Sequence, residues 1–572
     1  MDPQCYPIST LPGTTALFRD YLAAAASPNP AALRRWYPTD PFSMTWANHS
    51  PTLDESHRSR LTDALLRQAD GFDASGSVLA NGGRTVLANI ERLKHGAAAV
   101  VTGQQVALFG GPLLTLLKAA TAIRKAQDAT QATGREHVPI FWLATEDHDL
   151  AEVDQLALLS KTSVETLRLN LPSHHPLPVG AMRIDGGHDA GRVHLEAELD
   201  RASELLGWAP ISTLLREYYS PDATLAGAFG RLLTKIFAPH GLIVMDAASR
   251  EFHALGASVL RAAIERADEL EAALLARTHE LEAAGYHAQV LVTPSHSLLF
   301  LIESDTHARL PLRRTPETSE QPDGGWKAGT HLYTTADLLE ILATTPERLS
   351  PNALLRPLFQ DTILPTAAYI GGPAEVAYFA QSAVLYEHIF ASDGASGGTA
   401  GRITPILPRL SATLIEPAIA SAMAAHELDL PQILEAKTAG ALALRLGARA
   451  MPIEGKRKIA AAGNAMDAEL TALTEYMTAM SPDLGRSASV SASKMRYQMN
   501  RLRRMAATFE LQRETSLKKH ATAILLSLYP DGHLQERLLG GVWFLARYGD
   551  TLPDLLIEHA AQECPGHRVL YL

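Results

Sequence analysis

Apolar residues along the chain occur in two patterns, as short continuous runs and as series at helical spacing. The run at residues 97–101 ends before Gly103, and from Leu113 onwards leucine, alanine and isoleucine recur every three or four positions. These patterns predict a strand, a turn and a helix, and the next apolar run, at residues 138–145, predicts a second strand. A strand–helix–strand unit of this kind builds a parallel sheet, whose ligands bind at the carboxyl ends of the strands.

Four later apolar runs extend this pattern and predict an α/β core. They lie at residues 241–247, 289–293, 298–303 and 366–372, and a long amphipathic helix is expected near residues 250–284. We expect the core to occupy residues 1–410, with insertions at about 155–238 and 295–345. The glycine-rich residues 392–402 suit a surface loop better than a phosphate-binding loop, because they do not follow a strand and open a helix.

Beyond residue 411 the apolar positions lie almost entirely at helical spacing, which predicts a helical region at residues 411–572. Two series step by threes and fours: Ile459, Gly463, Met466, Leu470, Leu473, Met477 and Met480, then Met495, Gln498, Leu502, Met505 and Phe509. The turn sequence SPDLGR separates them, so an antiparallel coiled-coil hairpin is predicted at about 454–525. Its apolar residues can serve packing within the chain or self-association.

Composition limits the class of protein. A chain of 572 residues that is 46% hydrophobic and 20% charged can bury more than one core, and its net charge of -11 argues against nucleic acid as a partner. The two cysteines, Cys5 and Cys564, predict neither a disulfide framework nor a four-ligand zinc site, and they favour a reducing compartment. Without a secretory signal or an apolar run long enough for a membrane, we expect a cytoplasmic protein.

The sequence TGQQVALFGGP, between the first strand and its helix, has three interpretations: a plain turn, a phosphate cradle, or the floor of a site for a small polar substrate. A helix that starts near Gly111 and Pro112 presents unpaired N–H groups, which attract phosphate or carboxylate. Gln104 and Gln105 either orient a ligand with uncharged donors and acceptors or are simply exposed. Lys118 lies off the leucine face of the helix, so it is a solvated lysine or a substrate contact. Neither a Walker sequence nor a dinucleotide fingerprint occurs in the chain.

Carboxylates crowd the sequence TEDHDLAEVD, directly after the second strand. They repel one another unless a cation, a metal or a substrate ammonium lies among them. Glu146, Asp147, His148 and Asp149 are therefore candidate catalytic residues, with His148 either a general base or a residue that orders its neighbours. An acid-rich helix start and a metal site remain alternatives.

A third candidate stretch reads NALLRPLFQDTILPTAAYIGGPAEVAYF. A helix with Arg356 leads to a strand and then to a Gly-Gly-Pro turn, with Glu375 in the first turn of the next helix. We expect Gly372 to face the same crevice as Gly111 if both strands belong to one parallel sheet. Arg356 is a two-point carboxylate clamp or part of an ion pair within the domain, and Tyr369 is a core residue with a polar end or a substrate contact.

Three long stretches occur in order: VVTGQQVALFGGPLLTLLKA, PIFWLATEDHDLAEVD and LLRPLFQDTILPTAAYIGGPAEVAYF, with TPILPR after them. Together with the helical last third, they resemble the bacillithiol biosynthesis cysteine-adding enzymes, the BshC family, over essentially the full length. The resemblance implies a Rossmann-like parallel-sheet core with connecting-peptide insertions. It also implies a C-terminal antiparallel coiled coil that forms a homodimer.

The resemblance further implies an amide-forming ligase. It would join the carboxylate of L-cysteine to the amine of glucosaminyl malate, with ATP or another nucleotide as activating co-substrate and without a tightly bound metal. The matched positions imply substrate-binding roles for Gln104, Gln105, Gly111, Lys118, Arg356, Tyr369, Gly372 and Glu375. The alternatives are a metal-dependent hydrolase built on the acidic cluster and a non-catalytic coiled-coil scaffold of the pathway.

Overall fold

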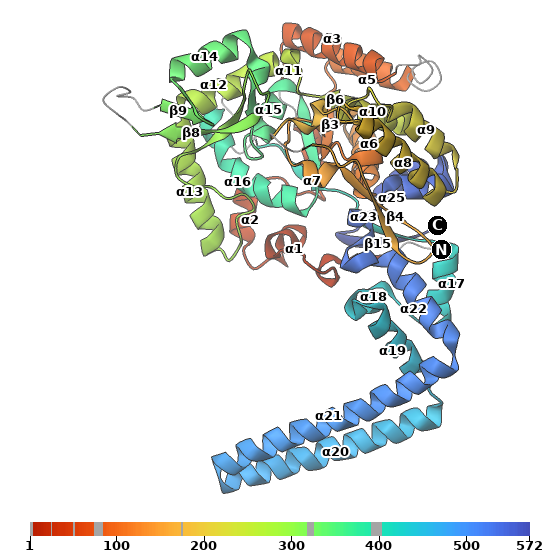
Figure 1. Ribbon diagram of the computed structural model, residues 1–572. Coiled ribbons are helices and arrows are strands. Elements are labelled where there is room, and N and C mark those ends of the chain that lie inside the picture. The colour runs from red at the N-terminus through yellow and green to blue at the C-terminus, as the bar shows by residue number, and fades with distance from the viewer. Residues whose placement is uncertain are drawn as a thin grey trace.

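A computed structural model describes residues 4–23, 26–49, 52–73, 84–172, 176–316, 325–390 and 403–572. The loop expected at residues 392–402 lies outside these ranges. Figure 1 shows a globular body, from which a pair of long helices projects as an arm. None of the helices in the described ranges combines the length and the apolar character that crossing a bilayer requires.

A five-stranded parallel sheet forms the centre of the body and confirms the α/β prediction. Its order is β13 (Ile406–Pro408), β12 (Thr366–Gly371), β2 (Ala98–Gln105), β3 (His137–Ala144) and β6 (Ile243–Asp246). β2 and β3 are almost entirely buried, and β12 is buried throughout, as expected for strands covered on both faces. The helices around the sheet include α6 (Leu114–Thr133), α15 (Arg356–Ile363) and α16 (Pro373–Ile389). The chain before β2 contributes α1 (Ala16–Ala23), α2 (Pro30–Trp36), α3 (Glu55–Phe72) and α5 (Arg84–Lys94).

Two groups of elements interrupt the sheet. Between β3 and β6 lie α7 (Leu150–Val153), the hairpin of β4 (Gln155–Leu159) and β5 (Val164–Arg168), and then α8 (Asp189–Leu205), α9 (Pro210–Tyr218) and α10 (Leu225–Phe237). After β6, an antiparallel sheet has the order β10 (His331–Tyr333), β9 (Gly325–Ala328), β8 (Arg309–Thr315), β7 (His296–Ile302) and β11 (Leu349–Pro351), with α14 (Thr335–Thr344) beside it. The strand predicted at residues 298–303 therefore exists, but it belongs to this second sheet.

Two local predictions between β6 and β7 are wrong. The helix expected near residues 250–284 is three helices, α11 (Arg250–Leu255), α12 (Ala257–Glu265) and α13 (Ala267–Ala283). The first break falls at Gly256, where a Cβ would lie only 2.2 Å from the ring of Phe359. Residues 289–293 form no strand, because the backbone of Val290 bonds in both directions to the side-chain amide of Gln381 (2.9 and 2.8 Å).

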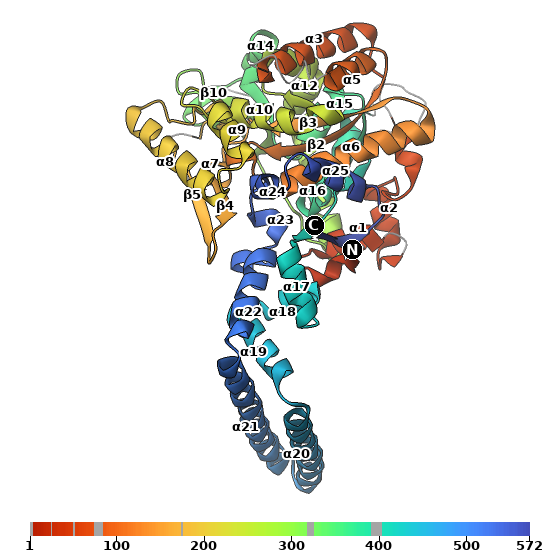
Figure 2. The ribbon, with the colours of Figure 1, turned by 90° about the vertical axis from the view of Figure 1, so that its right-hand side faces the viewer.

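The C-terminal region is mostly helical, but two of its strands join a third from the N-terminus. The sheet has the order β1 (Gln4–Pro7), β15 (Gly566–Tyr571) and β14 (Ala412–Ile415). Figure 2 shows the markers of the two chain ends close together over the lower part of the body. A disulfide links Cys5 to Cys564, which contradicts the expectation, based on the absence of a disulfide framework, that the cysteines favour a reducing compartment. Their separation of 559 positions hid a proximity that the β1–β15 pairing creates.

The predicted coiled-coil hairpin is present as α20 (Ile453–Met480) and α21 (Pro482–Arg513), which form the arm in Figures 1 and 2. It ends earlier than expected, because α22 (Thr515–Leu528) is a separate helix. Small residues on α21, including Ala488 and Ala492, are buried, whereas much of the predicted apolar series, including Leu502, Met505 and Phe509, is exposed. The remaining helices of the region are α17 (Pro417–Ala425), α18 (Leu430–Ala436), α19 (Ala439–Ala450), α23 (Gln535–Leu538), α24 (Gly541–Tyr548) and α25 (Thr551–Ala560).

Candidate active site

The candidate residues gather at one edge of the parallel sheet. In the parallel register Gln104 pairs with Leu143 and Gln105 with Ala144, so TGQQ and the acidic turn that follows β3 lie side by side. β12 pairs with the other side of β2 and brings Gly372, directly after its end, to the same edge. This geometry follows from the shared direction of the strands, whose carboxyl ends meet at one edge.

Two cavities of about 470 Å³ each open at this edge, and they share the side chains or backbone of Trp142, Ala144, Asp147 and Arg356. We call them the acidic cavity and the cationic cavity. The acidic cavity lies against β7, β8 and β11 of the antiparallel sheet, and Glu146, His148 and Arg309 also line it. The cationic cavity is lined by charged residues that include Lys118, Glu375, Arg409 and Arg537.

Lys118 is buried, with only 4% of its surface exposed, so the solvated-lysine interpretation is wrong. Its Nζ lies 2.7 Å from Glu375 Oε2 and donates to Gly103 O (2.8 Å) and Gln104 Oε1 (3.0 Å). An ammonium group has three donors, and these contacts use all three. Burial lowers the pKa of Lys118, while the carboxylate of Glu375 opposes that shift. Lys118 therefore organises the cavity wall.

Glu375 connects this lysine to the Gly-Gly-Pro turn. Its carboxylate accepts hydrogen bonds from the N–H of Gly372 (2.7 Å) and the hydroxyl of Tyr369 (2.6 Å), which caps the start of α16. Burial alone would raise the pKa of Glu375, but Lys118 and the two hydrogen bonds outweigh burial and lower it. The carboxylate is thus held ionised on the wall of the cationic cavity.

Two arginines complete this wall. Arg356 donates to Gln360 Oε1 (2.9 Å) and Tyr378 OH (3.1 Å), and its guanidinium lies 4.7 Å from the ring centroid of Tyr369. Burial would lower the pKa of Arg356, but the adjacent tyrosines and Glu375 raise it above its ordinary value. Arg409 forms a buried two-point ion pair with Glu536 of α23, at 2.9 and 2.6 Å, which joins the body to the C-terminal region.

The acidic turn after β3 is held from two sides. Gln105 donates to Asp147 Oδ2 (2.7 Å), so TGQQ orients a carboxylate shared by both cavities. Glu146 forms a 2.9 Å ion pair with His253, a histidine of α11 with no exposed surface. Burial would lower the pKa of His253, but Glu146 raises it above its ordinary value.

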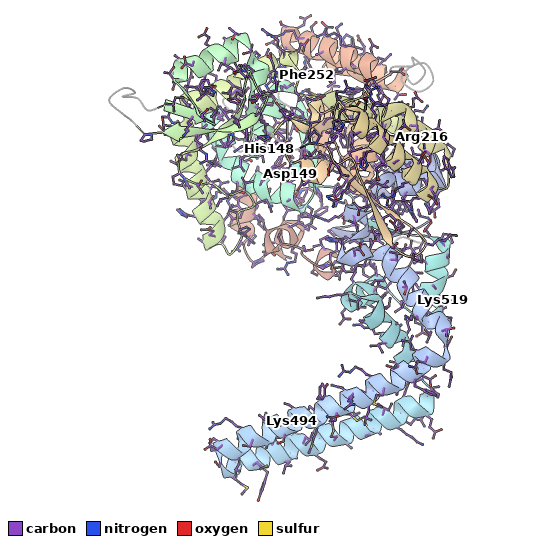
Figure 3. All side chains as sticks on the ribbon, viewed as in Figure 1. His148, Asp149, Arg216, Phe252, Lys494 and Lys519 are labelled. Carbon is purple, nitrogen blue, oxygen red and sulfur yellow. A yellow bond between two sulfur atoms is a disulfide. The ribbon has the colours of Figure 1, made fainter. Side chains whose placement is uncertain are left out.

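His148 and Asp149, labelled side by side in Figure 3, are both exposed but differ in their surroundings. His148 lines the acidic cavity, and its Nδ1 lies 3.2 Å from Nη1 of Arg309. Arg309 is buried, and its guanidinium lies 3.7 Å from the ring centroid of Phe300. Asp149 precedes α7 and lines neither of the two cavities, so it does not join the other members of the cluster.

Gly111 is not part of the site, which contradicts the expectation that both Gly-Gly-Pro turns face one crevice. Its carbonyl accepts from the N–H of Gly541 (3.0 Å), and the N–H of Leu113 donates to Leu539 O (2.8 Å). The C-terminal region thus covers the start of α6. The turn has a structural role: Phe109 adopts a φ of 50°, and the next N–H, at Gly110, donates to the buried hydroxyl of Tyr219 (3.0 Å).

Four charged residues around the cavities were not predicted from the sequence: His253, Arg309, Arg409 and Arg537. Each of them is distant in sequence from the site residues that it contacts or faces, and none belongs to a motif with recognisable residue spacing. For Arg409 the sequence TPILPR was a partial signal, because it matched the family stretches. Among the described residues, no group of three or more His, Cys, Asp or Glu side chains is arranged to hold a metal ion. The described residues therefore offer no set of metal ligands that would support the alternative of a metal-dependent hydrolase.

Comparison with known proteins agrees with this architecture. Residues 1–392 match the family model described as bacillithiol biosynthesis BshC, N-terminal Rossmann-like domain, and residues 412–572 match BshC, C-terminal coiled-coil domain. Proteins named "Putative cysteine ligase BshC" are 40% identical in Koribacter versatilis, with 100% of both chains covered, and 33% identical in Solibacter usitatus, with 99% of both covered. A protein of the same name in Geobacillus kaustophilus is 27% identical over 98% of this chain and 99% of its own. The chain therefore belongs to the BshC family of bacillithiol biosynthesis.

Proposed function

We propose that the protein is a cysteine ligase that joins the carboxylate of L-cysteine to the amine of glucosaminyl malate. One observation carries this proposal: two adjoining cavities meet at Asp147 and Arg356, one with acidic groups and the other with a cationic wall. Both substrates carry an ammonium or amine and at least one carboxylate. A site with both kinds of wall can orient two such molecules toward each other.

Amide formation requires an activated carboxylate. With ATP as co-substrate, the cysteine carboxylate forms an adenylate with loss of pyrophosphate, or an acyl phosphate with loss of ADP. The sugar amine then attacks the carbonyl carbon, the new C–N bond replaces the C–O bond to AMP or phosphate, and the amine loses a proton. Pro373 and Ala374, in the first turn of α16, line the cationic cavity, where the positive end of the helix favours an anionic intermediate.

Specific residues are assigned as follows within this proposal. Asp147, held by Gln105, accepts the proton of the attacking amine or binds the cysteine ammonium. Glu146 and His148 line the cavity beside it and contribute negative charge and a titratable group. Arg356 faces both cavities and pairs with a carboxylate of either substrate.

We also propose that the protein is a homodimer that associates through the α20–α21 hairpin. The hairpin exposes large apolar side chains, among them Leu502 (56%), Met505 (58%) and Phe509 (61%). A long arm with this many exposed apolar residues suits a partner helix pair of the same kind, because burial of apolar area drives association.

The direct test is product formation. Purified protein is incubated with cysteine, glucosaminyl malate and ATP, and then with other nucleotides, and the mixture is analysed by mass spectrometry for the condensed thiol. The ligase proposal expects a product whose mass equals the sum of the two substrates less one water. Absence of that product under every nucleotide condition would contradict the ligase proposal and favour the scaffold alternative.

A further inference from the structure

Arg537 reaches the candidate site from the C-terminal region. It lies on α23 and lines the cationic cavity together with a third cavity of about 340 Å³. These two cavities share Pro373, Arg409 and Arg537. Arg537 therefore lies where the body and the C-terminal region meet around the site.

The other cations of the cationic cavity already have partners. Lys118 uses its three donors on Glu375, Gly103 and Gln104. Arg409 is held by Glu536, and Arg356 is held by Gln360 and Tyr378. Lys118 therefore has no free donor, whereas Arg356 and Arg409 have each committed part of the guanidinium group to a protein partner.

Arg537 differs from them. Arg537 is exposed to solvent, and within the described ranges its side chain makes no hydrogen bond and no ion pair. Its sequence neighbours are anchored: Gln535 bonds the backbone of Leu414 in both directions (2.8 and 2.9 Å), and Glu536 accepts from the N–H of Ala412 (2.8 Å). The backbone under Arg537 is thus fixed, while its guanidinium group is free to meet a ligand.

The charge around Arg537 favours an anionic ligand. Burial and repulsion from Arg409 lower the pKa of Arg537, and the attraction of Glu536 and Glu375 opposes this shift. Those two carboxylates are already engaged by Arg409 and Lys118. An additional anion would compensate a positive charge that the protein itself leaves without a contact partner.

We propose that Arg537 binds an anionic group of a substrate, a carboxylate or a phosphate, and so makes the C-terminal region part of the binding site. This inference rests on the proposed ligase function. The anion can belong to cysteine, to the malate part of glucosaminyl malate, or to ATP, and these sources are separated by experiment.

The test compares Arg537→Gln and Arg537→Lys with the wild-type protein and with Arg34→Gln. Arg34 is an exposed arginine of α2 that lines neither of the two main cavities nor the third, so its variant controls for loss of a surface charge. KM and kcat are measured for each of the three substrates in turn, and the Kd of each substrate is measured by calorimetry. Thermal unfolding reports whether the fold is preserved.

We expect Arg537→Gln to raise the KM and Kd of one substrate by about 10- to 100-fold, the range of one lost charge-assisted hydrogen bond. The values for the other two substrates, and the unfolding midpoint, should stay close to those of the wild type. Arg537→Lys should recover part of the affinity, and Arg34→Gln should match the wild type. The affected substrate identifies the source of the anion.

A second comparison checks the malate source. The methyl glycoside of glucosamine has the same amine but no carboxylate, so an effect through malate should disappear when its Kd is measured instead. The inference is overturned if Arg537→Gln leaves all three substrates unchanged, or if none of them binds the wild type. A wild-type protein that binds substrates but forms no product would contradict the ligase function, while the binding data would still decide the role of Arg537.

Discussion

Removal of the Lys118 ammonium group is expected to destabilise the fold as well as the site. In Lys118→Met, the carboxylate of Glu375 stays buried without its cation, and Gly103 O and Gln104 Oε1 lose their donor. Removing one partner of a buried ion pair costs about 3–5 kcal/mol of unfolding free energy. That loss is a large fraction of the stability of a typical domain, which is about 5–15 kcal/mol.

The double variant Lys118→Met/Glu375→Gln separates this cause from a simple packing defect. A neutral amide at position 375 removes the uncompensated charge, so the double variant should be more stable than Lys118→Met alone by about 2 kcal/mol. Wild type, both single variants and the double variant form a complete cycle. The measurement is urea unfolding at pH 7, followed by circular dichroism.

The pH dependence provides an independent check. Without Lys118, burial raises the pKa of Glu375, so the carboxylate takes up a proton at a higher pH in the folded variant than in the unfolded chain. The stability deficit of Lys118→Met should therefore shrink at lower pH. The reasoning fails if Lys118→Met stays within about 1 kcal/mol of wild type, below the range for a broken buried pair, or if the double variant is the less stable of the two.

Three further predictions concern the site, acid stability and assembly. Asp147→Asn should abolish turnover and leave the thermal transition nearly unchanged; normal activity in this variant would refute the placement of Asp147. His567 is buried, and burial lowers its pKa from 6.5 to about 4, so as the pH falls the unfolded state takes up a proton before the folded state does. The free energy of unfolding should therefore decrease by roughly 3 kcal/mol between these two pH values. In His567→Gln the free energy of urea unfolding should vary less with pH over that interval, and parallel curves for the two proteins would contradict this. Leu502→Glu/Met505→Glu should shift sedimentation toward monomer, whereas an unchanged dimer would place the interface elsewhere.

The parts of the fold that follow from local periodicity could be predicted from the sequence. Runs or series of apolar residues predict the β2–α6–β3 unit, β12 and the α20–α21 hairpin. The prediction of a strand at residues 289–293 was wrong, because the backbone of Val290 forms its hydrogen bonds with the side chain of Gln381 and not with a neighbouring strand. Such a partner, distant in sequence, leaves no trace in the local pattern.

The site was predictable only in part, for a related reason. Gln105 and Asp147 could be placed together because adjacent parallel strands end at one edge of the sheet. The two interpretations of Lys118 could not be separated from the sequence, because its burial depends on Glu375, a partner from a different helix. Gly111 looked like an open helix end, and only the folded C-terminal region reveals that Gly541 closes it. Contacts between charged groups of separate segments produce no periodic pattern in the sequence, so they cannot be predicted from it.

The closure of the α6 start by residues near the chain's end has a consequence for synthesis. A ribosome releases Arg537 and Gly541 only after all five strands of the parallel sheet have emerged, so in a nascent chain the start of α6 and the cationic cavity are open to water on one side. Translation that stops before this segment leaves a Rossmann-like body without its last wall. The start of α6 is therefore covered only after residues 539–541 have been synthesised.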